Sequence, residues 1–204
     1  MITIIDYGLG NIQAILNIYK RLGISVKVAS TKEDLADAQR IILPGVGSFD
    51  WAMMRLTQSG MLDNLERLVV MRERPVLGIC VGMQMMAERS DEGDAKGLGW
   101  IDAEVKKFDE ESFVQQTHLP HMGWNDVCPR ETGGLFAGLE EGAMFYFLHS
   151  YYFEPRDSND VLAITDYNGM YASSVRHGNV FGVQFHPEKS HQWGIQLLKN
   201  FAEL

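Results

Sequence analysis

The sequence predicts an α/β fold with a mostly parallel central sheet, flanking helices and an antiparallel β extension. In the first 80 residues, short apolar strands alternate with helical patterns, which is typical of βαβ units and a parallel sheet. In the second half, strand-like segments follow one another with hairpin-type turns, and the chain closes on an amphipathic helix. We expect one domain, 1–204, because the length suits one and no repeat or linker interrupts it.

The first half begins with a buried strand at 2–6, after which the turn "YGLGN" brings Asn11 to the start of a helix. Apolar residues at helical spacing then run from Ile12 to Leu22, and Gly23 is a typical residue to end that helix. The remaining elements of this half are a strand at 24–30, a short helix at 32–38, a strand at 40–44, a helix at 61–73 and a strand at 75–79.

The second half is predicted to be mainly antiparallel. Its strand-like segments are 99–108, 143–153, 161–165, 170–178 and 179–185. The closing helix, 190–203, presents Trp193, Leu197, Leu198 and Phe201 on one face.

Composition restricts the partners. The net charge of −9, without a basic run, disfavours nucleic acid and anionic membranes. Two cysteines are too few for a disulfide framework and suit a reducing compartment. The start "MITIIDYGLG" lacks signal-peptide features, and no apolar stretch is long enough to span a bilayer. We therefore expect a cytoplasmic protein, and we expect no metal and no cofactor.

One cysteine lies between glycines at the end of a predicted strand. The segment 75–87 reads as a strand, then Gly-x-Cys-x-Gly, then a helix whose packing face holds Met83, Met86 and Ala87. Hydrolases place a nucleophile on such a strained turn, where glycines avoid clashes and the helix N-terminus favours a thiolate. Cys80 is therefore the candidate nucleophile, whereas the second cysteine, Cys128, has no such context and is interpreted as structural.

A catalytic cysteine needs a base. In "VQFHPEKS", His186 ends a predicted strand and Glu188 lies two positions on, so in extended backbone both side chains would share a face. Pro187 between them stiffens the pair. His149 in "FLHSYY" is the rival base, although no acid lies close to it in sequence.

The loop after the third strand is a candidate oxyanion site. Pro44-Gly45-Val46-Gly47 offers flexible backbone N–H groups at the carboxyl end of a strand, and the N–H of Val81 follows the nucleophile. The competing interpretation is a phosphate cradle, but the loop lacks the lysine and hydroxyl residues of a P-loop.

Together these segments resemble the class I glutamine amidotransferases, and among them the glutaminase subunits that serve a (β/α)₈-barrel cyclase in histidine biosynthesis. The resemblance runs nearly end to end. It rests on "IIDYGLGNI" (4–12), "LPGVGSF" (43–49), "GICVGMQ" (78–84), "LPHMGWN" (119–125), "YFLHSYY" (146–152) and "FGVQFHPEKS" (181–190). The stretch 108–119 does not look typical of the family.

The resemblance implies hydrolysis of glutamine to glutamate and ammonia. Cys80 would attack the side-chain amide, His186 would transfer the proton, and Glu188 would orient His186. The oxyanion hole would be formed by Val46, Gly47 and Val81, the glutamine would be held by Gly47, Gln84, Glu92, Ser150 and Tyr151, and the partner-facing residues would be His121, Met122, Trp124, Asn125 and Lys189.

The resemblance also implies a partner. Ammonia released into neutral water is protonated and stops being a nucleophile, so we expect the cyclase subunit to dock over the site as a heterodimer. Three alternatives stay open: an ammonia donor for amidine formation on a surface-polysaccharide sugar, a γ-glutamyl peptidase, and a non-catalytic module. The first would have the same catalytic half, and an intact Cys80, His186 and Glu188 argue against the third.

Overall fold

The fold is centred on one large mixed sheet. The computed structural model describes residues 1–114 and 117–204, and across these ranges it holds an eleven-stranded sheet and a two-stranded sheet. The large sheet runs in the order β2-β1-β3-β4-β13-β12-β10-β6-β5, with β11 beside β12 and β8 beside β11. Two of the residues in the atypical stretch 108–119, at 115–116, lie outside the described residues.

The parallel half of the sheet forms as predicted from the first 80 residues, but it also includes β13, which belongs to the half of the chain predicted to be mainly antiparallel. Its strands are β1 (Ile2–Ile5), β2 (Val26–Ala29), β3 (Arg40–Gly45), β4 (Val76–Cys80) and β13 (Val180–Val183), and all neighbouring pairs among them are parallel. The extension consists of β12 (Met170–His177), β10 (Tyr151–Pro155), β6 (Ala103–Lys107), β5 (Arg89–Ser90), β11 (Val161–Asp166) and β8 (Cys128–Pro129). From β13 to β6 the pairs are antiparallel, which confirms the predicted fold class.

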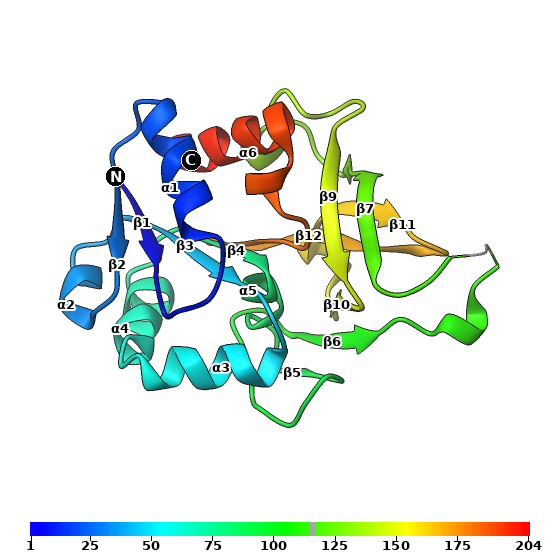
Figure 1. The fold of residues 1–204 in the computed structure, drawn as a ribbon, viewed down its shortest axis with the longest axis horizontal. Helices are drawn as coiled ribbons and strands as arrows, with labels where there is room; N and C mark the ends of the chain where they lie inside the picture. Colours follow the sequence, from blue (N-terminus) through cyan, green and yellow to red (C-terminus); the bar gives the residue numbers. More distant parts are fainter. Residues whose placement is uncertain (115–116) are drawn as a thin grey trace.

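Helices cover both faces of the parallel half (Figure 1). On one face lie α1 (Ile12–Arg21) and α6 (His191–Glu203), joined by a hydrogen bond of 2.9 Å from the buried Tyr19 hydroxyl to the Leu198 carbonyl. On the other lie α3 (Phe49–Gln58) and α4 (Leu62–Glu66) (Figure 1). The chain also forms α2 (Lys32–Leu35), α5 (Val81–Gln84), a π-helix at Arg67–Met71 and short 3₁₀ turns at Glu110–Ser112, Gly134–Phe136, Ser158–Asp160 and Pro187–Lys189.

Several predicted elements differ from the structure. The helix expected at 61–73 is α4 followed by the π-helix, the strand expected at 99–108 begins only at Ala103, and α3 is not predicted at all. Asn11 stands at the N-cap of α1, but its side chain makes no capping hydrogen bond. Such differences at helix ends are expected, because local spacing reports periodicity better than it reports boundaries.

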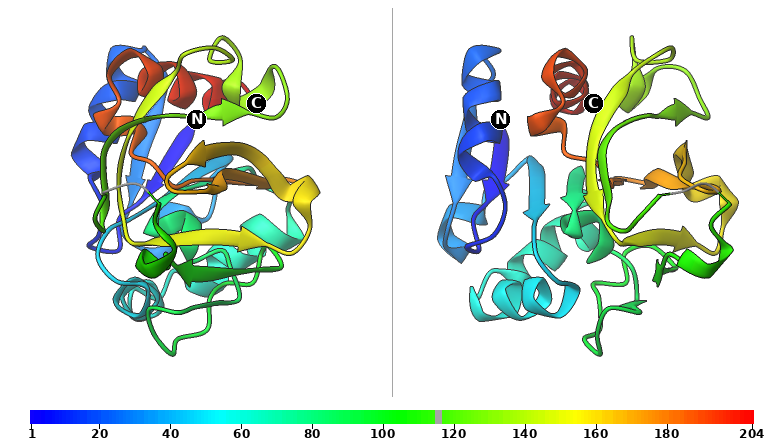
Figure 2. Two further views of the ribbon diagram at one scale, coloured as in Figure 1. Left: turned by 90° about the vertical axis from the view of Figure 1, so that its right-hand side faces the viewer. Right: turned by 45° about the vertical axis from the view of Figure 1, so that its right-hand side comes forward.

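The predicted strand 143–153 is in fact two strands in two sheets. β9 (Met144–His149) pairs with β7 (His121–Asp126) in the two-stranded sheet, whereas β10 pairs with β6 and β12. Figure 2 shows β7 and β9 rising beside the edge of the large sheet. The chain changes sheet at Ser150, which therefore lies at the junction between the two layers.

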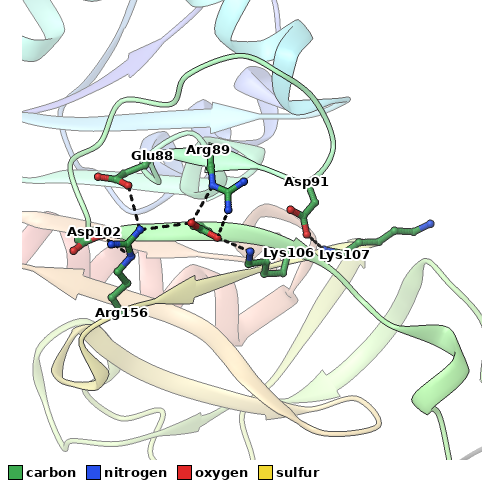
Figure 3. Close-up of polar contacts among 8 residues, drawn as sticks. Glu88, Arg89, Asp91, Asp102, Lys106, Lys107 and Arg156 are labelled. Atoms are coloured by element: carbon green, nitrogen blue, oxygen red, sulfur yellow. Dashed lines mark hydrogen bonds and ion pairs between the residues drawn. The ribbon is translucent and has the colours of Figure 1, made fainter.

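An ion-pair network ties the edge strand β5 to its neighbour β6 (Figure 3). Glu104 in β6 accepts hydrogen bonds from Arg89 Nε and Nη2 at 2.9 and 2.8 Å, and it also pairs with Lys106 and Arg156. The hydrogen bonds from Lys106 and Arg89 lower the pKa of Glu104 to about 2. The network stabilises β5, the strand that leads directly into Glu92.

Within the described ranges, no helix is long and apolar enough to cross a membrane.

Candidate active site

The nucleophile elbow forms at the junction of β4 and α5. Cys80 is the last residue of β4, and its φ of 54° and ψ of −114° are unusual for a residue other than glycine. Backbone strain of this kind persists only where the surrounding structure enforces it, and it is concentrated at functional sites. The Cys80 side chain is only 4% exposed.

Three glycines permit the close approach that enforces the elbow. A Cβ atom on Gly82 would lie 1.9 Å from the Leu43 carbonyl oxygen, and one on Gly45 would lie 2.4 Å from the Gly82 nitrogen. A Cβ on Gly78 would lie 2.6 Å from the Gly82 oxygen. Steric need for glycine beside Cys80 is therefore confirmed. The predicted helix through Ala87 is not, because α5 is a single turn, so its dipole contributes little to a thiolate.

His186 and Glu188 form a buried pair. His186 Nδ1 lies 3.0 Å from Glu188 Oε1, and the two side chains are 5% and 2% exposed. The sequence predicts that extended backbone brings the two side chains together, but the structure brings them together in another way. β13 ends at Val183, and the 3₁₀ turn Pro187–Lys189 brings Glu188 back to the imidazole.

Hydrogen bonds hold the backbone of His186 in place. Its N–H donates to the Tyr146 carbonyl of β9 at 2.9 Å, and its carbonyl accepts from Ser190 Oγ at 2.6 Å. Ser190 Oγ also accepts from the Tyr146 N–H at 3.0 Å. His186 is thus attached to β9 on one side and to the start of α6 on the other.

The electrostatics of His186 favour the imidazolium. Burial alone would lower its pKa, but the hydrogen bonds with Cys80 and Glu188, together with the charges of those two groups, raise the pKa of His186 to about 10. A cysteine that interacts with a protonated imidazole is favoured as a thiolate. The site can therefore supply a nucleophilic sulfur and a proton donor together.

The side-chain amide of Gln184 also lies close to the Cys80 sulfur. Gln184 Nε2 lies 3.8 Å from Cys80 Sγ, and the Leu148 carbonyl oxygen lies 4.0 Å from the same atom. Gln184 is fully buried. Sequence reasoning missed this residue, although it stands two positions before His186 in "VQFHPEKS".

The rival base, His149, is held in a neutral role. Its Nδ1 lies 2.8 Å from the Tyr151 carbonyl, which can only accept, so Nδ1 carries the proton. Burial, with a smaller effect from the neighbouring His121, lowers the pKa of His149 to about 3. These properties favour His186 as the base.

A small cavity of about 110 Å³ opens beside Cys80. Its lining consists of Gly47, Cys80, Val81, Gln84, Glu92, Leu148, His149, Ser150 and Tyr151. All five predicted glutamine contacts therefore border one space with the candidate nucleophile. A larger cavity of about 870 Å³ lies near the amino end of β13, against Trp100 and the π-helix, and it contains none of these residues.

The polar residues of the cavity are anchored by other elements. Glu92 Oε2 accepts from the Phe49 N–H at 2.8 Å, so this carboxylate also caps α3. Gln84 Nε2 donates to the Tyr151 carbonyl and to Gln184 Oε1, at 3.1 Å each.

Gly47, in the predicted oxyanion loop, has a φ of +90°. The loop is anchored at Pro44, whose carbonyl accepts from the Tyr7 hydroxyl at 2.7 Å. Val46, the remaining predicted oxyanion residue, is exposed and does not line the cavity.

The predicted partner-facing residues separate into two groups. Met122 and Trp124, in β7, are 66% and 42% exposed, and Lys189 is exposed as well, whereas Asn125 is partly buried. His121 is a correction: alternation along β7 turns it inward, where its ring stacks on Phe147. Cys128 is exposed in β8 and does not line the cavity.

The described residues contain no group of three or more His, Cys, Asp or Glu side chains that could hold a metal ion.

Comparison with known proteins gives consistent matches. A profile of the family described as "Glutamine amidotransferase class-I" matches residues 3–204. "Imidazole glycerol phosphate synthase subunit HisH" of Bdellovibrio bacteriovorus is 56% identical over 204 residues, covering 100% of both chains. Similar proteins of Leptospira interrogans (the same name) and Pseudomonas aeruginosa ("subunit HisH 2") are 47% and 46% identical, again over 100% of both chains.

Solved structures share the fold. "Crystal structure of glutamine amidotransferase" superimposes with a TM-score of 0.73 at 21% identity and covers 100% of this chain and 99% of that one. "Structure of PurLQS from Thermotoga maritima" has a TM-score of 0.73 at 16% identity and covers 99% and 97% of the two chains.

Proposed function

The chain belongs to the class-I glutamine amidotransferase family, and on that premise we propose that it is the glutaminase subunit of imidazole glycerol phosphate synthase in histidine biosynthesis. It hydrolyses glutamine to glutamate and ammonia. A cyclase subunit uses the ammonia to form imidazole glycerol phosphate and aminoimidazole carboxamide ribotide. The observation that carries the proposal is the buried Cys80–His186–Glu188 arrangement beside a cavity of about 110 Å³.

The first half of the reaction forms a thioester. The Cys80 sulfur attacks the side-chain amide carbon of glutamine, and the carbonyl oxygen becomes negatively charged. His186 holds the thiol proton and donates it to the departing nitrogen, which leaves as ammonia. The raised pKa of His186 supports this role, because the imidazolium is already present when the amine must leave.

Hydrolysis of the thioester completes the cycle. The now neutral His186 takes a proton from water, the hydroxide attacks the thioester, and Cys80 returns as the leaving group. Glu188 keeps Nδ1 protonated and oriented throughout, so that Nε2 faces the reaction. The oxyanion is stabilised by the N–H of Val81 and by N–H groups of the Val46–Gly47 segment.

Glutamine recognition involves the remaining cavity residues. Glu92 binds the α-ammonium with the carboxylate oxygen that does not cap α3, and Gln84, Ser150 and Tyr151 contact the rest of the substrate. The capping bond to the Phe49 N–H supports the assignment of Glu92, because it restricts the orientation of this carboxylate.

A partner covers the outer face of the β7–β9 sheet. Met122, Trp124, Met144 and Leu148 are exposed apolar side chains of these strands, and exposed apolar clusters are typical of protein interfaces. Leu148 also lines the cavity, so a subunit docked here would lie next to the ammonia source. We propose that this partner is a (β/α)₈-barrel cyclase, that Lys189 and Asn125 contribute at the margin, and that the heterodimer works in the cytoplasm with residues 1–204 as one domain.

The test separates the two half-reactions. Cys80→Ala is expected to abolish glutamine-dependent product formation by the complex and to leave the ammonium-dependent reaction intact. Loss of both activities in a complex that still assembles would contradict the proposed division of labour. Glutamine use by the wild-type chain with a cyclase other than the histidine-pathway enzyme would contradict the pathway.

A further inference from the structure

We propose that Gln184 is a further catalytic residue, whose side-chain amide donates a hydrogen bond to the Cys80 sulfur and favours the thiolate. The inference rests on the proposed function, since it concerns the same nucleophile. It adds a donor that the arrangement of cysteine, histidine and glutamate does not include.

Besides the imidazole of His186, three local features act on the charge of the sulfur. The Leu148 carbonyl oxygen, 4.0 Å from Cys80 Sγ, carries partial negative charge and disfavours a thiolate. α5 is a single turn and offers little dipole in compensation. Gln184 Nε2, at 3.8 Å, supplies partial positive charge on a fully buried side chain, where electrostatic interactions are strong.

The orientation of the amide is determined by a backbone carbonyl. The Tyr151 carbonyl can only accept, so Gln84 must direct its NH₂ group toward it, at 3.1 Å. The same Gln84 Nε2 lies 3.1 Å from Gln184 Oε1, which therefore accepts. Gln184 must then direct its NH₂ group toward Cys80. The reverse orientation would place two donors against each other.

A chain of buried histidines ends on the same backbone carbonyl. The Tyr151 carbonyl also accepts from His149 Nδ1 at 2.8 Å, which leaves His149 Nε2 as an acceptor. His121 Nδ1 lies 3.2 Å from that nitrogen and acts as its donor, because His121 Nε2 lies 3.2 Å from the Asn125 amide nitrogen. The Tyr151 carbonyl therefore accepts from both His149 and Gln84.

Gln84 acquires a defined polarity from the same arrangement. Both protons of its Nε2 are used by Tyr151 and Gln184, so the atom that Gln84 offers to the cavity is its oxygen. An acceptor in this position prefers the NH₂ group of glutamine over the carboxylate of glutamate.

The experiment measures the ionisation of the sulfur directly. In a Cys128→Ser background, which removes the exposed thiol, the rate of Cys80 alkylation by iodoacetamide is followed against pH. Gln184→Met removes the donor at similar volume, and Gln184→Glu keeps the acceptor for Gln84 but replaces the donor with an acidic group. Both are expected to raise the midpoint of alkylation by about one pH unit or more, and to lower kcat for glutamine about tenfold in the complex with cyclase.

The matched control is Ser174→Ala. Ser174 is also fully buried, its hydroxyl donates to the Gly182 carbonyl at 2.8 Å, and it does not line the cavity. It is expected to leave the alkylation midpoint unchanged. Ammonium-dependent activity reports assembly, and Gln184→Asn, which withdraws the amide by one methylene, replaces Gln184→Met if that variant does not assemble.

Unchanged midpoints in the Gln184 variants, or an equal shift in Ser174→Ala, would overturn the assignment. Alkylation does not involve glutamine, so failure of the wild-type complex to use glutamine would count against the proposed function and not against the role of Gln184.

Discussion

Replacing Glu188 with glutamine removes one negative charge from the buried pair with His186 and changes its size very little. The amide oxygen of the new side chain can still accept from His186 Nδ1 over the present 3.0 Å. The variant therefore isolates the electrostatic contribution of the carboxylate from its orienting contact.

The expected magnitude follows from the raised pKa. The pKa of His186 rises from 6.5 to about 10, and since one pKa unit corresponds to about 1.4 kcal/mol, the imidazolium is favoured by roughly 5 kcal/mol. Burial opposes this, Cys80 supplies the largest favourable part, and Glu188 supplies the next. Replacing a charged hydrogen-bond acceptor with a neutral one costs about 1–2 kcal/mol, so we expect a loss of about 5- to 30-fold in kcat/KM for glutamine.

The assay is the pH profile of glutamine-dependent kcat/KM in the complex with cyclase. The descending limb of the profile, where the imidazolium loses its proton, is expected to move from near pH 10 to lower pH by about one to two units. His186→Ala should be nearly as damaging as Cys80→Ala, because members of such a unit act together. The matched control is Glu140→Gln, which neutralises an exposed carboxylate that is remote in sequence from Glu188. An unchanged profile and unchanged kcat/KM in Glu188→Gln would refute the reasoning.

Three further perturbations test the surrounding structure. Gly82→Ala would place a Cβ 1.9 Å from the Leu43 carbonyl oxygen, so we expect a loss of about 1–3 kcal/mol in urea unfolding together with loss of glutaminase activity; wild-type stability would contradict the packing argument. Burial lowers the pKa of His121 to about 4 and that of His149 to about 3, both below the unfolded value of 6.5, so their contribution to stability is present above pH 6.5 and is lost as the pH falls. At pH 5 this amounts to about 2 kcal/mol per histidine in urea unfolding, and equal stability at pH 7 and 5 would exclude it. Gly47 allows the peptide of the oxyanion loop to adopt more than one orientation at low energetic cost, and only one of them points an N–H toward the oxyanion. We therefore expect the isolated chain to turn over glutamine about 10²–10³ times more slowly than the complex with acceptor-loaded cyclase. Equal rates would exclude gating of the loop by the partner.

The sequence by itself determined the fold class and predicted the candidate reacting groups. Alternation of strand and helix patterns predicts a parallel sheet, because period and spacing are local properties that survive in any tertiary context. The pattern of glycines around Cys80 can likewise be interpreted from the neighbouring residues, because a strand that bends sharply into a helix leaves little room for side chains. At Gly78 this is so, because a Cβ there would lie 2.6 Å from the oxygen of Gly82, four positions on. Gly82 itself is constrained by the Leu43 carbonyl of β3, a contact that only the tertiary structure creates.

Only the tertiary structure decided which polar groups meet. No spacing rule predicts that Gln184 approaches Cys80 across 104 positions of sequence, or that Glu92 caps a helix beginning at Phe49. The division of 143–153 at Ser150 is of the same kind, since a continuous strand pattern does not say which sheet each half will join. Burial of His121 depends on register, and one step along a strand reverses every side chain. Contacts of this sort depend on how distant segments pack and on where buried donors find acceptors, and neither is encoded in a local pattern.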